Sequence, residues 1–432
     1  MSGDLEASVF RKVGRRLIPF LGVLYFAAFL DRVNVGFAAL QMNRDLGFNA
    51  AVYGFGAGIF FIGYCLFEVP SNLCLHRFGG RRWISRIMLT WGVIGAVTAF
   101  VPDARSFFAL RFVLGIAEAG FFPGIIYYLT NWVPAPRRAR VVSAFMTAVP
   151  VSTAIGGPLS SAILALDGRL GLAGWQWLFL LETVPSLVLG FAAYRWLPDS
   201  PREARWLSEG ERRWLLETIE RERGPAERSR PLGSVLLHPR ILALGACYFG
   251  FSIGLYGVIL WLPQILHSVG LADRWVGIGV AVPYGLAAAG MVLWSRHSDR
   301  RDERRWHLAG AALLACAGLL ASAFLGDTPR LAVVSMSVAA VGTLAVLPVF
   351  WTLPAALVSG VEAAAAIALI NAIGNIGGFV GPYLIGWIKD ATGQFTWGLV
   401  ATALAMLASG LFALVLARTA PAGGRRAAAQ SL

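Results

Sequence analysis

Four ionisable residues lie well inside long apolar runs of this sequence, namely Asp31, Arg32, Arg111 and Glu118. Each run is long enough to cross a bilayer as a helix, because about 20 residues at a rise of about 1.5 Å span the hydrocarbon core. A charged group at that depth costs roughly 3 kcal/mol on insertion scales, and such groups usually face a bundle interior or a water-filled cavity. These residues therefore indicate a functional site within the membrane.

The spacing of Arg111 and Glu118 suits a proton switch. They are seven residues apart, about two turns, so both side chains lie on one face of a helix. A buried carboxyl favours its neutral form, whereas a neighbouring arginine favours the charged form. Protonation of the acid would free the arginine to bind an anion, and a guanidinium pairs well with the two oxygens of a carboxylate.

The same residues also allow plainer interpretations. Asp31 and Arg32 could be a helix-end pair that extends to the membrane surface, although residues 33–40 continue the apolar run. Glu118 could form a static structural ion pair with Arg32 or with Arg111.

Three uncharged polar residues are weaker candidates for the same site. Tyr64, in the second apolar run, either lines the cavity or packs as an ordinary aromatic. Asn371 and Asn375 are one turn apart in the eleventh run, where buried amides need hydrogen-bonding partners. Contact with a substrate and hydrogen bonding between helices are both open for this pair.

The composition is typical of a chain with many membrane-spanning helices. Of its 432 residues, 57% are hydrophobic and 14% are charged, whereas soluble domains usually carry about 25% charged residues. The net charge of +13 comes almost entirely from arginine. These arginines cluster in short connections between apolar runs, so membrane topology explains them better than a nucleic-acid partner does. We expect the lipid bilayer and a small substrate as partners.

Twelve apolar runs of helical length recur along the chain, and the longest polar stretch divides them into two sets of six. We predict an all-α integral membrane protein of two pseudo-symmetric six-helix bundles. The predicted spans are 17–40, 53–75, 84–101, 107–131, 141–166, 175–197, 240–267, 276–296, 307–326, 331–350, 363–388 and 396–418. The expected divisions are a cytoplasmic tail at 1–16, a bundle at 17–197, a cytoplasmic linker with an amphipathic helix at 198–239, a bundle at 240–418 and a disordered cytoplasmic tail at 419–432.

Arginine clusters predict the orientation. They occur before the first span, after the second, fourth and eighth spans, and after the last, whereas the intervening connections hold single basic residues. The positive-inside rule then places both termini and the linker in the cytoplasm. The N-terminus lacks a short apolar segment followed by a small-residue cleavage site, so we expect the first run to remain as a spanning helix. The sequence predicts a multi-pass protein of the inner, plasma membrane.

The linker is expected to contain a surface helix. Ser208 and Glu211 fit a capping box, in which each side chain accepts a hydrogen bond from the backbone N–H of the other residue. The pair Gly224-Pro225 would end this helix. Its apolar stripe would consist of Trp214, Leu215 and Ile219.

The two halves repeat certain features. Basic clusters follow the second and eighth spans, and Gly-Pro pairs occur at 157–158 in the fifth span and at 381–382 in the eleventh. Such repeats are the architecture of many secondary transporters, in which the substrate binds between the halves near the midplane. The sequence has no metal-ligand cluster, nucleophile–base arrangement or phosphate-binding Gly–Lys loop. We therefore expect neither an enzyme nor a metal or organic cofactor.

Several motifs resemble the anion:cation symporter family of the major facilitator superfamily. They are DRVNVG from Asp31, GYCLFEVPSN from Gly63, GIAEAGFFPG from Gly115, LPDSP from Leu197 and NAIGNIGGFVGPYLIG from Asn371. Similar proteins take up organic anions such as tartrate, sugar acids, phthalate or hydroxyphenylacetate with protons. The resemblance implies a monomeric, proton-coupled importer of a small organic anion that works by alternating access. An exchanger or uniporter on the same fold is the alternative.

The resemblance also implies roles for individual residues. Asp31 and Glu118 would be the proton-coupling carboxyls, with the proton as coupling ion. The residues expected to bind the substrate are Arg32, Arg111, Tyr64, Asn371 and Asn375.

The expected gating residues lie in the basic loops of the two halves. They are Arg77, Arg81, Asp299 and Arg300. This chain departs from the usual gate motif because it carries His76 where the superfamily normally has Asp, and Asn72 where it normally has Gly. The roles of His76 and of Glu362, at the start of the eleventh span, stay open.

Overall fold

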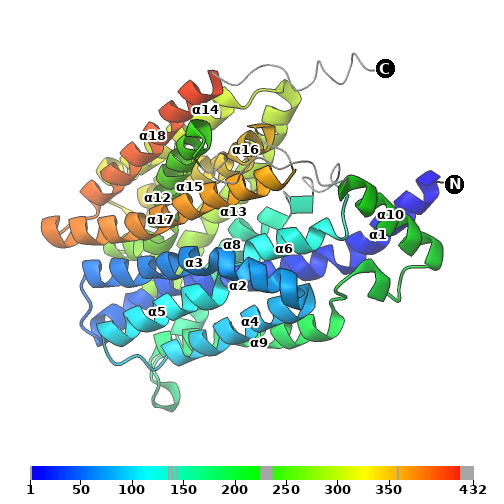
Figure 1. Ribbon diagram of the computed structural model, residues 1–432. Coiled ribbons are helices and arrows are strands. Elements are labelled where there is room, and N and C mark those ends of the chain that lie inside the picture. The colour runs from blue at the N-terminus through cyan, green and yellow to red at the C-terminus, as the bar shows by residue number, and fades with distance from the viewer. Residues whose placement is uncertain are drawn as a thin grey trace. The chain divides into compact units, whose positions relative to one another are not determined.

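The computed structural model describes residues 2–134, 137, 141–142, 145–223, 237–357 and 360–418. Every regular element within these residues is a helix (Figure 1), as the apolar runs predicted. The chain separates into two compact units, which are described one at a time. Unit 1 comprises Met1–Phe48, Ile59–Arg228 and Asp273–Gly277, and unit 2 comprises Asn49–Gly58, Ser229–Ala272 and Ile278–Leu432.

The helices follow the predicted runs closely. Those of the first half are α1 (Ser2–Arg16), α2 (Ile18–Asp45), α3 (Ala50–Phe78), α4 (Gly80–Thr98), α5 (Ala104–Glu118), α6 (Phe121–Thr130), α8 (Ala148–Leu164), η1 (Arg169–Gly171) and α9 (Gly174–Trp196). Between the halves lie η2 (Pro201–Glu203) and α10 (Glu209–Arg223). Those of the second half are α12 (Pro239–Ser268), α13 (Asp273–Arg301), α14 (Arg305–Leu325), α15 (Pro329–Phe350), α16 (Thr352–Leu357), α17 (Gly360–Thr392) and α18 (Thr396–Arg418).

Ten helical segments among the described residues are long and apolar enough to cross a membrane. The helix α8 is apolar but shorter, and α4 begins with the arginine cluster of residues 81–86, which lowers its hydropathy. Each of the twelve predicted spans coincides with one of these ten segments, with α8 or with α4. The predicted all-α membrane fold is therefore confirmed.

In unit 1, α4 lies against α9, and α2 lies against both α8 and α9. Small residues allow the helices to approach closely, as is usual in membrane bundles. A Cβ atom at Gly115 of α5 would overlap the backbone oxygen of Phe60 on α3, and one at Gly63 would overlap that of Phe112. This close approach of α3 and α5 brings the aromatic residues of α3 next to Arg111.

The fourth predicted span, 107–131, is divided in the structure. Helix α5 ends at Glu118, and α6 begins at Phe121 after Gly120, whose φ of +80° lies in the left-handed region. Glycine adopts this conformation without the steric penalty that a side chain would add. The expectation of one continuous helix is wrong at this point, because the backbone turns directly after the carboxyl that the sequence singled out.

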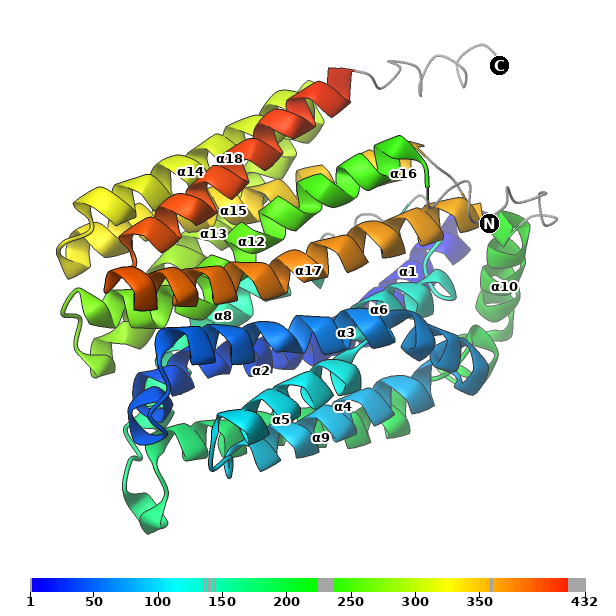
Figure 2. The same ribbon diagram turned by 60° about the vertical axis from the view of Figure 1, so that its left-hand side comes forward.

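In unit 2, α12 lies alongside α17 and α18, and α14 lies alongside α15 and α18 (Figure 2). Glycines again permit the close contacts. A Cβ atom at Gly250 would overlap the side chain of Ser409, and one at Gly377 would overlap the backbone oxygen of Phe249.

The first sixteen residues include a helix that we did not predict. Val9 and Val13 of α1 are fully buried, and Phe10 packs edge-to-face on Trp214 of α10, with 6.2 Å between ring centroids. The Nζ of Lys12 donates to Oε2 of Glu211 at 2.7 Å. An apolar stripe and one ion pair thus join α1 to α10.

Helix α10 begins with the predicted capping box. The backbone N of Ser208 donates to the carboxylate of Glu211 at 2.7 Å, and the N of Glu211 donates to the serine hydroxyl at 3.3 Å. Leu215 and Ile219 of its apolar stripe are buried. The predicted stop at 224–225 and the tail at 419–432 lie outside the described residues, as does the side chain of Glu362.

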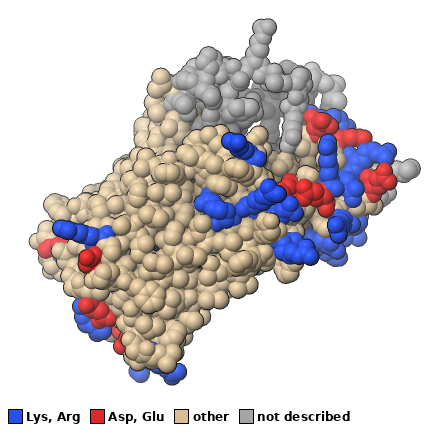
Figure 3. Space-filling model, turned by 60° about the horizontal axis from the view of Figure 1, so that its bottom comes forward, with Lys and Arg blue, Asp and Glu red and all other residues tan. Residues whose placement is uncertain are grey.

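Charged side chains are unevenly spread over the face drawn in Figure 3. They gather at the end that carries α1 and α10, and a smaller group lies at the opposite end (Figure 3). The surface between the two groups is largely uncharged, as expected for a segment that faces lipid hydrocarbon.

Candidate functional site

An ion pair between Arg32 of α2 and Glu118 of α5 lies inside unit 1. The guanidinium Nη2 donates to Oε1 of the carboxylate, and the two side chains are 11% and 4% exposed. Glu118 occupies the last residue of α5, directly before the backbone turn at Gly120. The pair therefore holds a helix end against the middle of α2.

Aromatic rings surround the guanidinium of Arg32. Its central carbon lies 5.1 Å from the ring centroid of Phe29, 5.3 Å from that of Phe60 and 5.5 Å from that of Tyr64. A cation over an aromatic face gains electrostatic stabilisation, and more so where water is excluded. These rings fix the position of the arginine while leaving its in-plane donors directed at anionic partners.

Arg111 extends the same cluster. It is 1% exposed, its guanidinium carbon lies 5.1 Å from the ring centroid of Phe60, and it interacts electrostatically with Glu118. The seven-residue spacing correctly predicted that these two side chains share a face. Of the two ion pairs that the sequence allowed for Glu118, the contact with Arg32 is present in the structure.

Asp31 lies inside unit 1 and not at a surface. Its Oδ2 accepts hydrogen bonds from Nε1 of Trp91 at 2.8 Å and from Oγ of Ser186 at 2.5 Å. Its Oδ1 is buried without a hydrogen-bond partner among the described residues. Asp31 and Arg32 therefore point into different parts of the bundle, because Asp31 contacts α4 and α9 whereas Arg32 contacts α5. The helix-end interpretation of this pair is wrong.

Tyr64 packs as an aromatic in unit 1, and its predicted role in lining a cavity stays a prediction. It is 5% exposed and packs as an aromatic, with 6.1 Å between its ring centroid and that of Phe60. It also contacts the guanidinium of Arg32, so it belongs to the cluster.

The two asparagines belong to unit 2. Asn371 and Asn375 are one turn apart on α17, and Asn375 is buried. Their predicted role near a substrate stays a prediction, because the cluster just described belongs to unit 1.

Three of the four predicted gating residues make contacts that we can describe. Arg81 pairs with Asp199, with 3.4 Å between Nε and Oδ2, and Arg77 lies over the ring of Phe78 at 5.6 Å. Asp299 pairs with Arg304 at 2.6 Å, whereas the predicted Arg300 is exposed at the end of α13. Their gating role is not tested by these contacts.

The sequence reasoning missed Glu182, a third buried carboxyl of unit 1. It lies in α9 and is 2% exposed. Its position in the sequence signals it, since Glu182 lies inside the sixth apolar run just as Asp31 and Glu118 lie inside the first and the fourth. Trp91 and Ser186 were also missed. No local sequence pattern predicts them, because they are singled out only by their hydrogen bonds to Asp31 on another helix.

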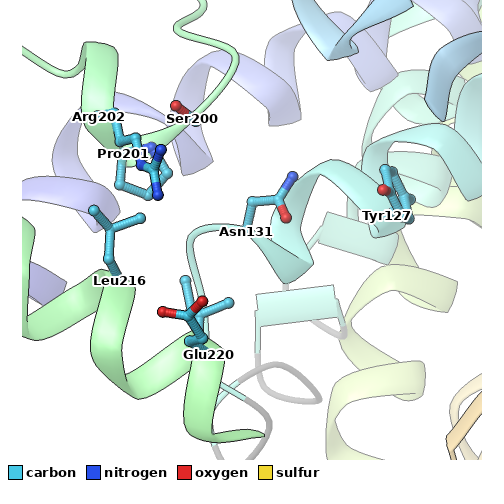
Figure 4. Close-up of a pocket in the computed structure, with 8 residues that line it drawn as sticks. Tyr127, Asn131, Ser200, Pro201, Arg202, Leu216 and Glu220 are labelled. Carbon is cyan, nitrogen blue, oxygen red and sulfur yellow. The ribbon is translucent and has the colours of Figure 1, made fainter. Parts of the chain in front are cut away.

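A separate cavity of about 380 Å³ opens between the end of α6, the η2 turn and α10 (Figure 4). Its volume would suit a small molecule. The arginines and carboxyls of the cluster are not among its lining residues, which are Tyr127, Asn131, Ser200, Pro201, Arg202, Leu216, Ile219 and Glu220.

Long apolar helices that enclose buried arginines and carboxyls are the arrangement of a multi-pass membrane protein. The sequence profile of the Major Facilitator Superfamily matches residues 21–382 and 276–431. The chain is 51% identical over 432 residues to an Agrobacterium vitis protein named "Putative tartrate transporter", with 99% of each chain covered. It is 40% identical over 417 residues to the "Quinolone resistance transporter" of Acinetobacter baumannii, covering 96% of this chain and 95% of the relative. This chain belongs to the Major Facilitator Superfamily.

Solved structures agree on the fold. A crystal structure of a bacterial homologue of the human lysosomal transporter Spinster superposes with a TM-score of 0.75 at 19% identity, over 93% of this chain and 96% of the other. At this identity the likeness concerns the fold alone. Proteins of this superfamily are transporters, so this protein is a transporter and not an enzyme.

Proposed function

We propose that this protein imports a small organic anion together with protons by alternating access. The observation that carries the proposal is the buried Arg32–Glu118 ion pair, held under aromatic rings with Arg111 beside it. A cation that is already paired with an internal carboxylate cannot bind a second carboxylate equally well. Protonation of Glu118 removes the competing charge and makes Arg32 available to an incoming anion.

The cycle follows from this competition. A proton and an anion load together from one side, the halves rock, and deprotonation of Glu118 restores the ion pair and expels the anion on the other side. Asp31 would bind a further proton beside α4 and α9. The coupling ion is thus the proton, and the cycle uses no organic cofactor or metal.

Dicarboxylates are the substrate class that we favour. The names of the Agrobacterium vitis relatives refer to tartrate, and two arginines in one cluster suit two carboxylates. We further propose an inner-membrane monomer with both termini in the cytoplasm, on the basis of the arginine distribution. The partners would be the anion and the lipid bilayer, without nucleic acid.

Transport in proteoliposomes tests the proposal. An inward proton gradient should drive tartrate accumulation in the wild type, and Glu118→Gln should abolish gradient-driven accumulation while tartrate counterflow continues. The control is Glu209→Gln on α10, whose carboxyl is 85% exposed and distant from the cluster in sequence. A quinolone is tested in parallel as the alternative substrate that the name of one relative suggests.

Two results would count against the proposal. Accumulation that is equal in Glu118→Gln and the wild type would remove Glu118 from proton coupling. A rate of tartrate exchange that is independent of pH in the wild type would favour an exchanger or uniporter on the same fold.

A further inference from the structure

Glu182 is a buried carboxyl that the cycle proposed above does not use. It is 2% exposed on α9, and its Oε1 accepts a hydrogen bond from Oγ of Ser160 on α8 at 2.7 Å. Its Oε2 is buried without a hydrogen-bond partner among the described residues. Burying a carboxylate is costly unless a cation or several donors compensate its charge. The groups around Glu182 therefore decide whether its carboxyl can be charged as well as protonated.

No lysine or arginine among the described residues of α2, α4 or α8 pairs with Glu182. Helix α8 has no charged residue, and the arginines of α4 lie in its first two turns. Gly95 of α4 faces Thr183, the neighbour of Glu182, and Arg86 lies nine residues before Gly95, about 13 Å along the helix. The titratable group that acts on Glu182 is Asp31 of α2.

Asn34 of α2 is a neighbour of Glu182 whose amide group suits either protonation state of the carboxyl. Its side chain acts on Glu182 as a hydrogen-bonding group, and it is 2% exposed. Its Oδ1 is also buried without a partner among the described residues. An amide donates to a carboxylate through its NH₂ group and accepts from a protonated carboxyl through its oxygen. The hydroxyl of Ser160 can likewise donate or accept, so the site can hold Glu182 with and without a proton.

Ser186 connects this site to Asp31. It lies one turn after Glu182 on α9, and its Oγ donates to Oδ2 of Asp31 at 2.5 Å. A cavity of about 10 Å³ beside Asp31 is also lined by Asn34 and Arg111, and this volume is roughly what one water molecule needs. Ser186 thus joins α9, one turn from Glu182, to the carboxylate of Asp31.

We propose that Glu182 binds one of the protons that move with the anion and passes it to and from Asp31. In each transfer an O–H bond of one carboxyl breaks and an O–H bond of the other forms, with the proton carried by a water molecule that enters the small cavity beside Asp31 and Asn34. The proposal rests on the proposed proton-coupled transport. It adds a proton site on the side of unit 1 formed by α2, α8 and α9, separate from the Arg32–Glu118 pair.

Transport stoichiometry gives the first test. In proteoliposomes, Glu182→Gln should lower tartrate accumulation about tenfold for each pH unit of imposed gradient, because one proton fewer would move with each anion. Tartrate counterflow without a gradient should stay at the wild-type rate, which shows that the variant folds and binds. Glu182→Asp keeps a carboxyl and should restore gradient-driven accumulation. Wild-type accumulation in a Glu182→Gln protein with intact counterflow would overturn the proposal.

Infrared spectroscopy of the reconstituted protein gives a second test that needs no substrate. The C=O stretching band of protonated carboxyls should change between acidic and alkaline buffer in the wild type, and the difference spectrum of Glu182→Gln should lack one component of this band while those of Asp31 and Glu118 remain. Asp31→Asn should alter the pH dependence of the band, since Glu182 would lose the carboxyl with which it is proposed to exchange its proton. A difference spectrum that is identical in the wild type and Glu182→Gln would contradict proton binding at Glu182. If the wild type shows this band but no gradient-driven uptake, the proposed function fails while the proton site stands.

Discussion

Arginine has a chemical role at position 32 that lysine cannot take over. Its planar guanidinium can stack on rings and at the same time present paired donors to a carboxylate. Both features are present, because Arg32 lies between the rings of Phe29, Phe60 and Tyr64 and donates to Glu118. We infer that the same donors bind the substrate when Glu118 is protonated.

Arg32→Lys should therefore retain the charge and lose most of the affinity. A hydrogen bond to a charged group is worth about 1.5 to 3 kcal/mol, which corresponds to a rise in the Kd for tartrate of roughly ten- to hundredfold. Titration calorimetry on the purified protein measures this constant. Arg274→Lys, at an exposed position at the start of α13, is the control. Equal affinity in Arg32→Lys and the wild type would show that Arg32 does not contact the anion.

Residue types in the sequence predicted part of the candidate site, and the other residues could be found only from the packing of the helices. Asp31, Arg32, Arg111 and Glu118 are found by sequence because a charge within an apolar run is rare. Trp91 and Ser186 contact Asp31 from helices that are 60 and 155 residues away in sequence, so no local pattern could predict them.

At the scale of helices, the contact between α3 and α5 positions the cluster. It depends on Gly63 and Gly115, at which a Cβ atom would overlap the backbone of the neighbouring helix. The sequence predicted both helices but not this contact. It also did not predict the turn at Gly120, because a Gly within an apolar run can continue a helix as readily as break it.

Gly115→Leu should destabilise the bundle, because the backbone of α3 cannot move aside as a flexible side chain could. Overpacking of this kind costs about 1 to 3 kcal/mol, so the midpoint of thermal unfolding in detergent should fall by several degrees. Gly22→Leu is the matched control, since nothing lies within 4 Å of a Cβ atom there. A midpoint equal to that of the wild type would mean that α3 and α5 are not in close contact.

The contact between α1 and α10 should depend on pH. Burial alone would raise the pKa of Glu211, but hydrogen bonds from Lys12, Ser8 and the backbone of Ser208 lower this pKa from its usual 4.5 to about 2. A group with a lowered pKa stabilises the folded state above its unfolded pKa and loses this effect as the pH falls through its folded pKa. The contact should be fully formed above about pH 5 and weaken progressively toward pH 2.

Glu211→Gln should weaken the same contact at neutral pH. Faster amide hydrogen exchange in α1 would report this change, because local opening exposes the backbone of the helix. Glu209→Gln, two residues earlier and on the exposed side of α10, should leave exchange in α1 unchanged. If both variants exchange alike, the carboxyl of Glu211 does not hold α1.

At the scale of the whole molecule, the buried charged residues of the candidate site belong to one of the two units. The apolar runs predicted the helices because bilayer thickness fixes their length. The buried arginines and carboxyls described above all lie in unit 1, whereas the candidate asparagines lie in unit 2. The helix α1 was missed because a short, charged amphipathic segment resembles a solvated tail until its partner helix is known. The repeated sequence features therefore indicated two six-helix halves, but they did not indicate how the buried charged residues are distributed between the two units.

Proton binding at Glu118 is proposed to free Arg32 for the anion, and the pH dependence of tartrate affinity tests this proposal most directly. Linkage requires that a proton which promotes anion binding be bound more tightly when the anion is present. In the purified wild type, tartrate affinity should fall as the pH rises, and in Glu118→Gln the slope of log Kd against pH should be smaller by about one proton per anion. A slope that is the same in both proteins would contradict the account.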